Sequence, residues 1–147
     1  MNPLFTDTMT VYNYHRDPET GEEAWYRSVI KGVQWRHNKT EITLSDGVRT
    51  ESKVEHVTID CGRSYGNKPY LPPQEFRKLP TGECGKYWTL DPRTSQDMIV
   101  LGAVDQEISA DYRLSRLLED HQYAVTVTSA SDNRGRPRLR HIQATGK

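Results

Sequence analysis

The sequence has few apolar residues and no long hydrophobic run. Hydrophobic residues make up 34% of the 147 residues, whereas about 45–50% is usual in globular proteins when glycine is counted too. Nothing approaches the roughly 20 consecutive apolar residues of a membrane-spanning helix. Residues 1–10 lack the basic and apolar segments of a signal peptide. We therefore expect a polar protein that stays in the cytoplasm of the cell that makes it and has no membrane partner.

The chain also has little that could serve metal or nucleophilic chemistry. Its two cysteines, Cys61 and Cys84, lie outside any CxxC motif, and thiols of cytosolic proteins normally stay reduced. We expect both to be free, with a disulfide between them as the less favoured alternative. Zinc binding needs clustered cysteine and histidine residues, but the five histidines are scattered singly. We therefore expect no metal site, no cofactor and no catalytic residues.

The chain has no excess charge of either sign, because 20 Lys and Arg residues balance 20 Asp and Glu residues. No overall field would draw it to nucleic acid or to an anionic membrane. One acidic pair, Asp105 and Glu107, is spaced so that both carboxylates would share a face of a strand. A small hydrolase could use such a pair, but a solvated strand face explains it as well, and we favour the solvated face.

Short runs of β-branched and aromatic residues, separated by turn residues, predict a β-rich fold. The runs are 8–14, 24–35, 41–44, 48–50, 54–60, 98–101, 123–130 and 136–144. Turn residues at 17–21, at Asp46-Gly47 and at 131–135 predict hairpins between neighbouring runs. Gly32 predicts a bend in the second run.

A long irregular loop follows the fifth run. Residues 61–85 hold glycine and proline at a density that excludes long regular elements, although Pro73 could open a helix of two turns that ends at Leu79. Large aromatic rings rarely stay exposed without a partner. We therefore expect Tyr70 and Trp88 to be mostly buried and to pin this loop to the sheet or to a neighbouring subunit.

A single convincing helix is predicted at about residues 111–120, with Ser109 as a candidate N-cap. Its apolar stripe consists of leucines at positions i, i+3 and i+4, namely Leu114, Leu117 and Leu118. The sum of these elements is one domain over residues 1–147. We expect it to be mainly β, a small antiparallel β-barrel or sandwich with one short helix and one long loop rich in glycine, proline and aromatic residues.

Four arginines near the C-terminus are spaced by two, namely Arg134, Arg136, Arg138 and Arg140. In an extended segment all four would project to one face. Such a stripe could contact phosphates or an acidic neighbouring subunit. It could equally be the solvated edge of a sheet, where positive charge prevents aggregation. Pro137 supports an edge position, because proline cannot donate to a ladder.

Both ends of the chain resemble the hairpins of phage head-closure (stopper) proteins. The resemblance at the start is carried by Phe5–Tyr12, Trp25-Tyr26 and Lys31–Trp35, and at the end by Tyr123–Arg136. The whole chain is also similar to an uncharacterised family of phage and prophage proteins of Firmicutes. Its recurring stretches surround Val33–Trp35, Gly66–Pro73, Gly85–Leu90 and Val100–Gly102. The middle, residues 38–120, departs from the stopper pattern, in which the barrel is shorter and lacks this loop and helix.

The resemblance implies a non-enzymatic structural protein of a tailed phage virion, a subunit of the neck between head and tail. Such a subunit would form a homo-oligomeric ring that contacts portal or adaptor and tail proteins, with DNA passing through its lumen. Two alternatives remain open. One is a structural protein of the tail-completion or tail-terminator type, and the other is a phage accessory protein that binds a host factor or nucleic acid.

Overall fold

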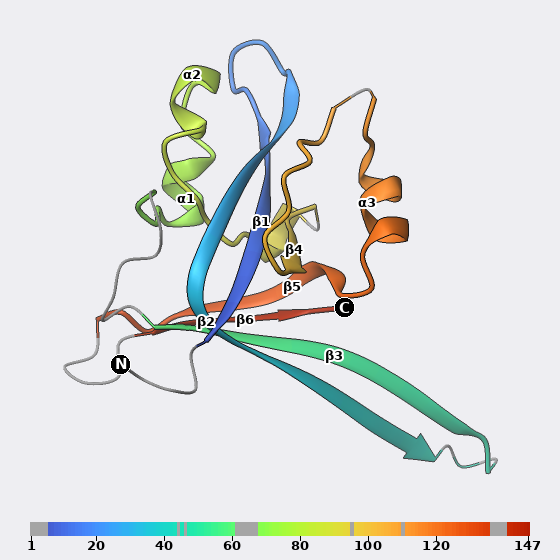
Figure 1. Ribbon diagram of the computed structural model, residues 1–147. Coiled ribbons are helices and arrows are strands. Elements are labelled where there is room, and N and C mark those ends of the chain that lie inside the picture. Colours follow the sequence, from blue (N-terminus) through green and yellow to red (C-terminus); the bar gives the residue numbers. More distant parts are fainter. Residues whose placement is uncertain are drawn as a thin grey trace.

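Six antiparallel strands form one sheet that closes on itself in the order β1-β2-β3-β6-β5-β4, with β4 paired back to β1 (Figure 1). The strands are β1 (Asp7–Arg16), β2 (Glu23–Thr43), β3 (Arg49–Asp60), β4 (Met98–Leu101), β5 (Ala124–Asp132) and β6 (His141–Gly146). The computed structural model describes residues 6–43, 45, 47–60, 68–94, 96–109, 111–135 and 141–147, and for residues 38–43, 49–53 and 81 the backbone alone. The mainly β, barrel-like architecture confirms the predicted fold class.

Short helical segments lie around the barrel. They are α1 (Pro73–Phe76), α2 (Thr81–Cys84), the 3-10 helix η1 (Pro92–Thr94) and α3 (Leu114–Asp120). The loop between β3 and β4 carries α1 and α2 on one side of the β1–β2 hairpin, and α3 lies on the other side (Figure 1). The side chain of Cys84 is a buried free thiol, as predicted, and Cys61 lies outside the described residues.

The alternation of β2 is interrupted at Gly32. Ile30 and Val33 are both buried in the barrel interior, although residues three apart in a regular strand point to opposite faces. The register with β1 passes from Lys31 directly to Val33, which leaves Gly32 as the extra residue of a β-bulge. Its φ of +78° lies in the left-handed region that favours glycine. The bend predicted at Gly32 is therefore confirmed.

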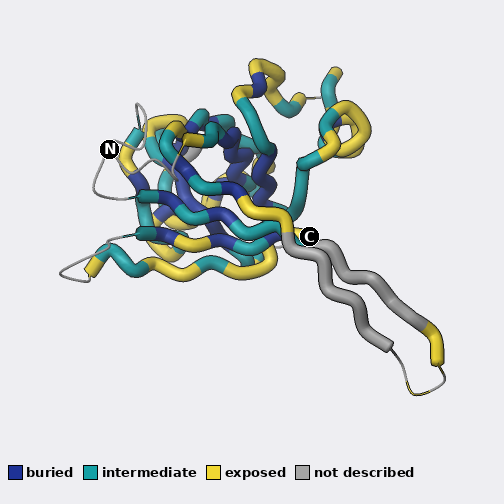
Figure 2. Tube along the Cα trace, turned by 60° about the horizontal axis from the view of Figure 1, so that its bottom comes forward, coloured by how far each residue is buried: buried dark blue, intermediate teal, exposed yellow. Residues whose placement is uncertain are grey.

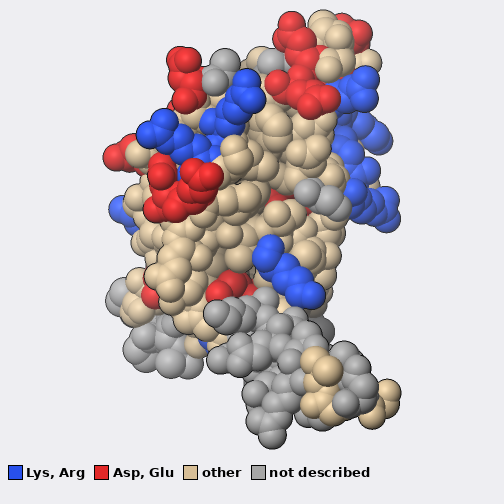
Figure 3. Space-filling model, turned by 90° about the vertical axis from the view of Figure 1, so that its right-hand side faces the viewer, with Lys and Arg blue, Asp and Glu red and all other residues tan. Residues whose placement is uncertain are grey.

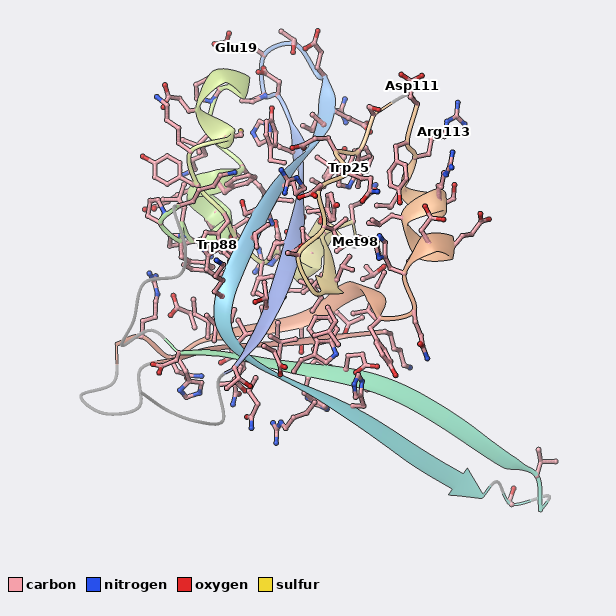
Figure 4. All side chains as sticks on the ribbon, viewed as in Figure 1. Glu19, Trp25, Trp88, Met98, Asp111 and Arg113 are labelled. Carbon is pink, nitrogen blue, oxygen red and sulfur yellow. The ribbon has the colours of Figure 1, made fainter. Side chains whose placement is uncertain are left out.

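Apolar side chains fill two clusters, one on each face of the sheet, and the buried positions concentrate in the barrel (Figure 2). The interior cluster includes Met9, Val11, Ile30, Val33, Trp88 and Ile99. The outer cluster, beneath α3 and the segment before it, comprises Tyr12, Met98, Val100, Val104 and Leu117. In Figure 4, Trp88 of the first cluster and Met98 of the second lie on opposite sides of the β1–β2 hairpin. Strands β1 and β4 are therefore covered on both faces.

The aromatic residues of the long loop anchor it to the barrel, as predicted. Trp88 is fully buried and Tyr70 is 8% exposed, and their rings pack edge to face at 4.9 Å between centroids. The indole Nε1 of Trp88 donates to the carbonyl of Lys68 at 3.1 Å. Phe76 is also buried and meets the edge of the His15 ring. The predicted two-turn helix is wrong in length, because α1 already ends at Phe76.

Strands β2 and β3 are longer than the sequence predicts. The run 24–35 and residues 41–43 of the next run belong to the single strand β2, and residues 49–50 and the run 54–60 belong to β3. Backbone ladder bonds do not need apolar side chains, so pairing continues through the polar residues between the runs. The strand prediction depended on apolar periodicity, and the residues between the runs have none.

The helix α3 also differs from its prediction. It begins at Leu114 with Arg113 as its N-cap, and no side chain caps it. The hydroxyl of Ser109 instead accepts the N–H groups of the residues two and three positions later, which closes a separate turn. Leu117 is buried, but Leu118 is 45% exposed. The predicted apolar stripe is therefore wrong at Leu118, because so short a helix buries a single row of side chains.

Replacing Gly32 with alanine should lower the free energy of unfolding by about 1–2 kcal/mol, because an L-residue is strained at a left-handed φ. Gly82→Ala is the matched control, since a Cβ at Gly82 would meet nothing within 4 Å. Chemical denaturation of both variants measures the difference. Equal stability of the two variants would contradict the bulge.

Candidate functional site

Among the four arginines of the predicted stripe, Arg134 alone lies in the described part of the chain. The other three fall within residues 136–140, outside the described residues, so the stripe itself stays a prediction. The guanidinium of Arg134 donates to Asp132 through two bonds, Nε to Oδ1 at 2.9 Å and Nη2 to Oδ2 at 2.8 Å. These hydrogen bonds lower the pKa of Asp132. The same guanidinium lies 4.6 Å from the centre of the Tyr70 ring, so Arg134 ties the turn after β5 to the long loop.

The acidic pair Asp105 and Glu107 does not form the arrangement that a hydrolase would need. Strand β4 ends at Leu101, and residues 103–108 form no strand. The shared strand face expected for the two carboxylates is therefore absent. Glu107 instead accepts a hydrogen bond from Nε of Arg27 at 3.0 Å, and both acids are exposed.

An open hollow of about 280 Å³ lies beside β2, lined by Arg27, Ser28, Val29, Ile30, Lys68 and Glu107. The ammonium of Lys68 donates to the carbonyl of Arg27 at 2.8 Å, and burial lowers the pKa of Lys68. The hydroxyl of Ser28 is buried and has no hydrogen-bond partner among the described residues. Two cations beside a buried hydroxyl could hold a small anion. Both cations, however, already donate hydrogen bonds to groups of this chain. The bond from Lys68 to the carbonyl of Arg27 chiefly holds residue 68 against β2.

The face that carries α3 presents side chains of both charge signs (Figure 3). Glu119 and Asp120, at the end of α3, are both exposed acidic residues. Asp120 already accepts a hydrogen bond from the Tyr112 hydroxyl at 2.8 Å and lies 3.7 Å from Nε of Arg116. Of the two acids, Glu119 is therefore the better candidate for contact with a basic group of a neighbouring molecule.

The ends of β2 and β3 leave the barrel as a two-stranded arm, formed by residues 38–43 and 49–54 (Figure 1). Strand β1 pairs with β2 up to Val33, and β6 pairs with β3 from Glu55 onward. Between Asn38 and Thr43 the strand β2 therefore pairs with β3 alone, within the described residues. Both outer edges of the arm lack a neighbouring strand there, and an isolated two-stranded ribbon is marginal in water.

The ladder of the arm places like charges opposite each other. Lys39 is paired with Lys53, and Glu41 is paired with Glu51. Like charges directly across a ladder are destabilising, whereas diagonal neighbours two residues away are more distant. Within a single arm, the charged residues of β2 are therefore opposite residues of the same charge in β3. Sequence reasoning recognised the hairpin but could not see this mismatch, because it becomes visible once the register is known.

Sequence reasoning missed a buried carboxyl, that of Asp97, which directly precedes β4. Asp97 accepts hydrogen bonds from the backbone N–H groups of Tyr14 at 2.9 Å and Asp91 at 3.0 Å. The side-chain amide of Asn13 donates to it at 3.0 Å, and Asn13 also bonds both backbone groups of Thr89. Desolvation raises the pKa of Asp97 to about 7. We call these residues the Asp97 network.

The Asp97 network holds several elements of the barrel together. It connects β1 to the segment before β4, and the Asp97 carbonyl accepts the N–H of Val127 in β5 at 2.8 Å. Asp91 in turn pairs with Nε of Arg77, next to α1, at 2.8 Å. Asp97 is fully buried, and neither of the hollows described for this chain reaches it. No signal in the sequence marks Asp97, since an isolated aspartate in a polar segment is ordinarily exposed.

Comparison with known proteins gives a family but no activity. Residues 4–147 match DUF6751, a family of unknown function. A segment of 50 residues is 38% identical to the quinoprotein ethanol dehydrogenase of Pseudomonas putida, and it covers 34% of this chain and 8% of the dehydrogenase. The chain thus spans a small fraction of that enzyme. No solved structure matches.

The described ranges also bear on metal binding and on membrane insertion. No group of three or more His, Cys, Asp or Glu side chains there is arranged to hold a metal ion. None of the helices in those ranges is long and apolar enough to cross a bilayer.

The Asp97 network predicts an inverted pH dependence. Because the folded-state pKa of Asp97, about 7, exceeds its ordinary value of 3.8, the folded state binds the extra proton between these values. The stability contributed by Asp97 is therefore complete at the acid end and is lost as the pH rises toward 7. Asp97→Asn cannot titrate, so the stability difference between parent and variant should shrink from pH 4.5 to pH 7.5.

The variant itself should be about 1–3 kcal/mol less stable than the parent at low pH, because its amide would face an N–H donor that now lacks an acceptor. Urea denaturation across the pH range measures both effects. Asp105→Asn, which removes an exposed carboxyl, is the control. Parallel pH curves for the parent and Asp97→Asn would show that Asp97 does not titrate in this range.

Proposed function

The chain belongs to the DUF6751 family, and we propose that it is a non-enzymatic structural protein of a tailed phage virion that works as a ring-forming subunit of the neck. The arm formed by residues 38–43 and 49–54 carries this proposal. It extends about 20 Å beyond the barrel, at some 3.3 Å per residue. The core clusters of the described residues lie outside the arm, so the arm is available to contact another subunit.

The terminal hairpins support the same proposal. The segments that resemble stopper proteins form the β1–β2 hairpin and the β5–β6 pair, and these four strands belong to one closed barrel. Both hairpins therefore belong to the one barrel from which the arm projects. A barrel with a projecting arm suits a protein that repeats around a ring, since each copy can reach its neighbour.

This proposal predicts that the protein is a stoichiometric part of mature particles. Mass spectrometry of virions purified from the phage or induced prophage that encodes it should find the chain at a copy number comparable to other neck proteins. A cytoplasmic protein of the same phage is the control for contamination. Absence from purified virions would overturn the structural function and favour an accessory role.

The predicted arginine stripe has its own test. Arg138→Glu should leave the monomer folded and reduce its incorporation into particles or its binding to short duplex DNA. Binding to DNA, if it occurs, should weaken steeply with salt, because each neutralised phosphate releases counterions. Arg93→Glu, at an exposed arginine of η1, makes the same charge change elsewhere. Normal assembly and unchanged duplex binding by Arg138→Glu would leave the stripe as a solvated edge.

A further inference from the structure

We infer that the arm pairs edge to edge with the arm of a second copy of this chain, with β2 of one copy beside β3 of the next and the register shifted by two residues. This inference deepens the proposed function, because it names the contact that joins neighbouring subunits. It rests on the backbone register of the arm and on the charges of the residues placed by that register.

The unpaired edges define what kind of partner the arm needs. Between residues 38 and 43 the outer edge of β2 has no neighbouring strand among the described residues, and between 49 and 54 the same holds for β3. Open edges are satisfied by strand addition. A second arm offers one β2 edge and one β3 edge, so head-to-tail addition covers both edges of every arm when the series closes into a ring.

The charges decide the register of that addition. Without a shift, Lys39 would lie beside Lys53 of the neighbouring copy and Glu41 beside its Glu51, which continues the mismatch of the single arm around the whole ring. A shift of two residues keeps the faces of the strands matched. It places Lys39 beside Glu51 of the neighbouring copy and Glu41 beside its Arg49. The Glu41–Glu51 pair is then flanked by a basic residue on each side, and the Lys39–Lys53 pair is flanked by Glu51 on one side and by His37 on the other.

A shift of two residues in the other direction fits less well. It would place Glu41 beside Lys53 of the neighbouring copy and Lys39 beside its Glu55. Glu55, however, already accepts a hydrogen bond from Nε1 of Trp35 at 3.0 Å and pairs with His37. This shift would also leave Arg49 without an acidic partner, since Arg49 is opposite Thr43 in its own arm. A stagger between neighbouring strands is in any case required when strands close into a cylinder.

The decisive variants are Lys39→Glu and Glu51→Lys. Each replaces a like-charge pair inside the arm with an opposite-charge pair, because position 39 is opposite Lys53 and position 51 is opposite Glu41. Neither change should therefore weaken the arm itself. Each places like charges side by side between copies, so half-maximal assembly should need a concentration on the order of tenfold higher than for the parent.

The double variant Lys39→Glu/Glu51→Lys restores opposite charges between copies and should assemble like the parent. An equimolar mixture of the two single variants should also assemble, with the two chains alternating. Native mass spectrometry and light scattering over a range of protein concentrations measure each case. Lys78→Glu and Glu19→Lys, at exposed positions outside the arm, are the matched controls and should assemble like the parent.

Three results would overturn the arm contact: a parent chain that stays monomeric at the highest attainable concentration, single variants that assemble like the parent, or a double variant that does not recover. A parent that stops at a two-fold dimer would overturn the head-to-tail arrangement. Assembly in solution with these charge effects, but absence from purified virions, would keep the arm contact and overturn the neck function. Presence in virions, with single variants that assemble like the parent, would keep the neck function and overturn the arm contact.

Discussion

The structure depends on one constraint, which is that a single strand must serve two partners. Strand β2 pairs with β1 in its first half and with β3 in its second half, and Val33 is the residue at which both ladders meet. The bulge at Gly32 lies directly before this point. It changes which residues face inward, so that Ile30 and Val33 both reach the core. Without the extra residue, the second half of β2 would turn its apolar side to solvent.

Closure of the barrel depends on a second feature, because β4 pairs with β1, a strand that is distant from it in sequence. Strand β4 closes the barrel between β1 and β5, yet it is four residues long and follows an irregular loop. The Asp97 network lies directly before it and supplies polar bonds to β1 and β5 on either side. Three N–H donors converge on one buried carboxyl. A buried group of this kind is costly unless its partners are in place, so it fixes the position at which β4 enters the sheet.

How far the sequence could predict this fold follows from these two features. Hairpins, the anchoring aromatics and the bend at Gly32 have local signals, and the structure confirms them. The length of β2 and β3 had none, because their middle parts pair through backbone groups between polar residues. The role of Asp97 also had none, since its partners Asn13 and Tyr14 are distant in sequence. The candidate arm was recognisable as a hairpin, but its charge mismatch depends on the register, which no local pattern supplies.

The low apolar content of the chain can be understood from the division between barrel and arm. Apolar residues concentrate in the barrel, where they cover β1 and β4 on both faces. The arm is built mostly from charged and hydroxyl residues. An apolar arm with two open edges would aggregate with any exposed strand, whereas charged edges discourage indiscriminate pairing. A row of charges that is mismatched within one arm and matched between shifted arms adds selectivity, because it disfavours the unshifted register and partners without the same pattern. Polarity in the arm is therefore compatible with assembly, provided that the neighbour carries the same pattern.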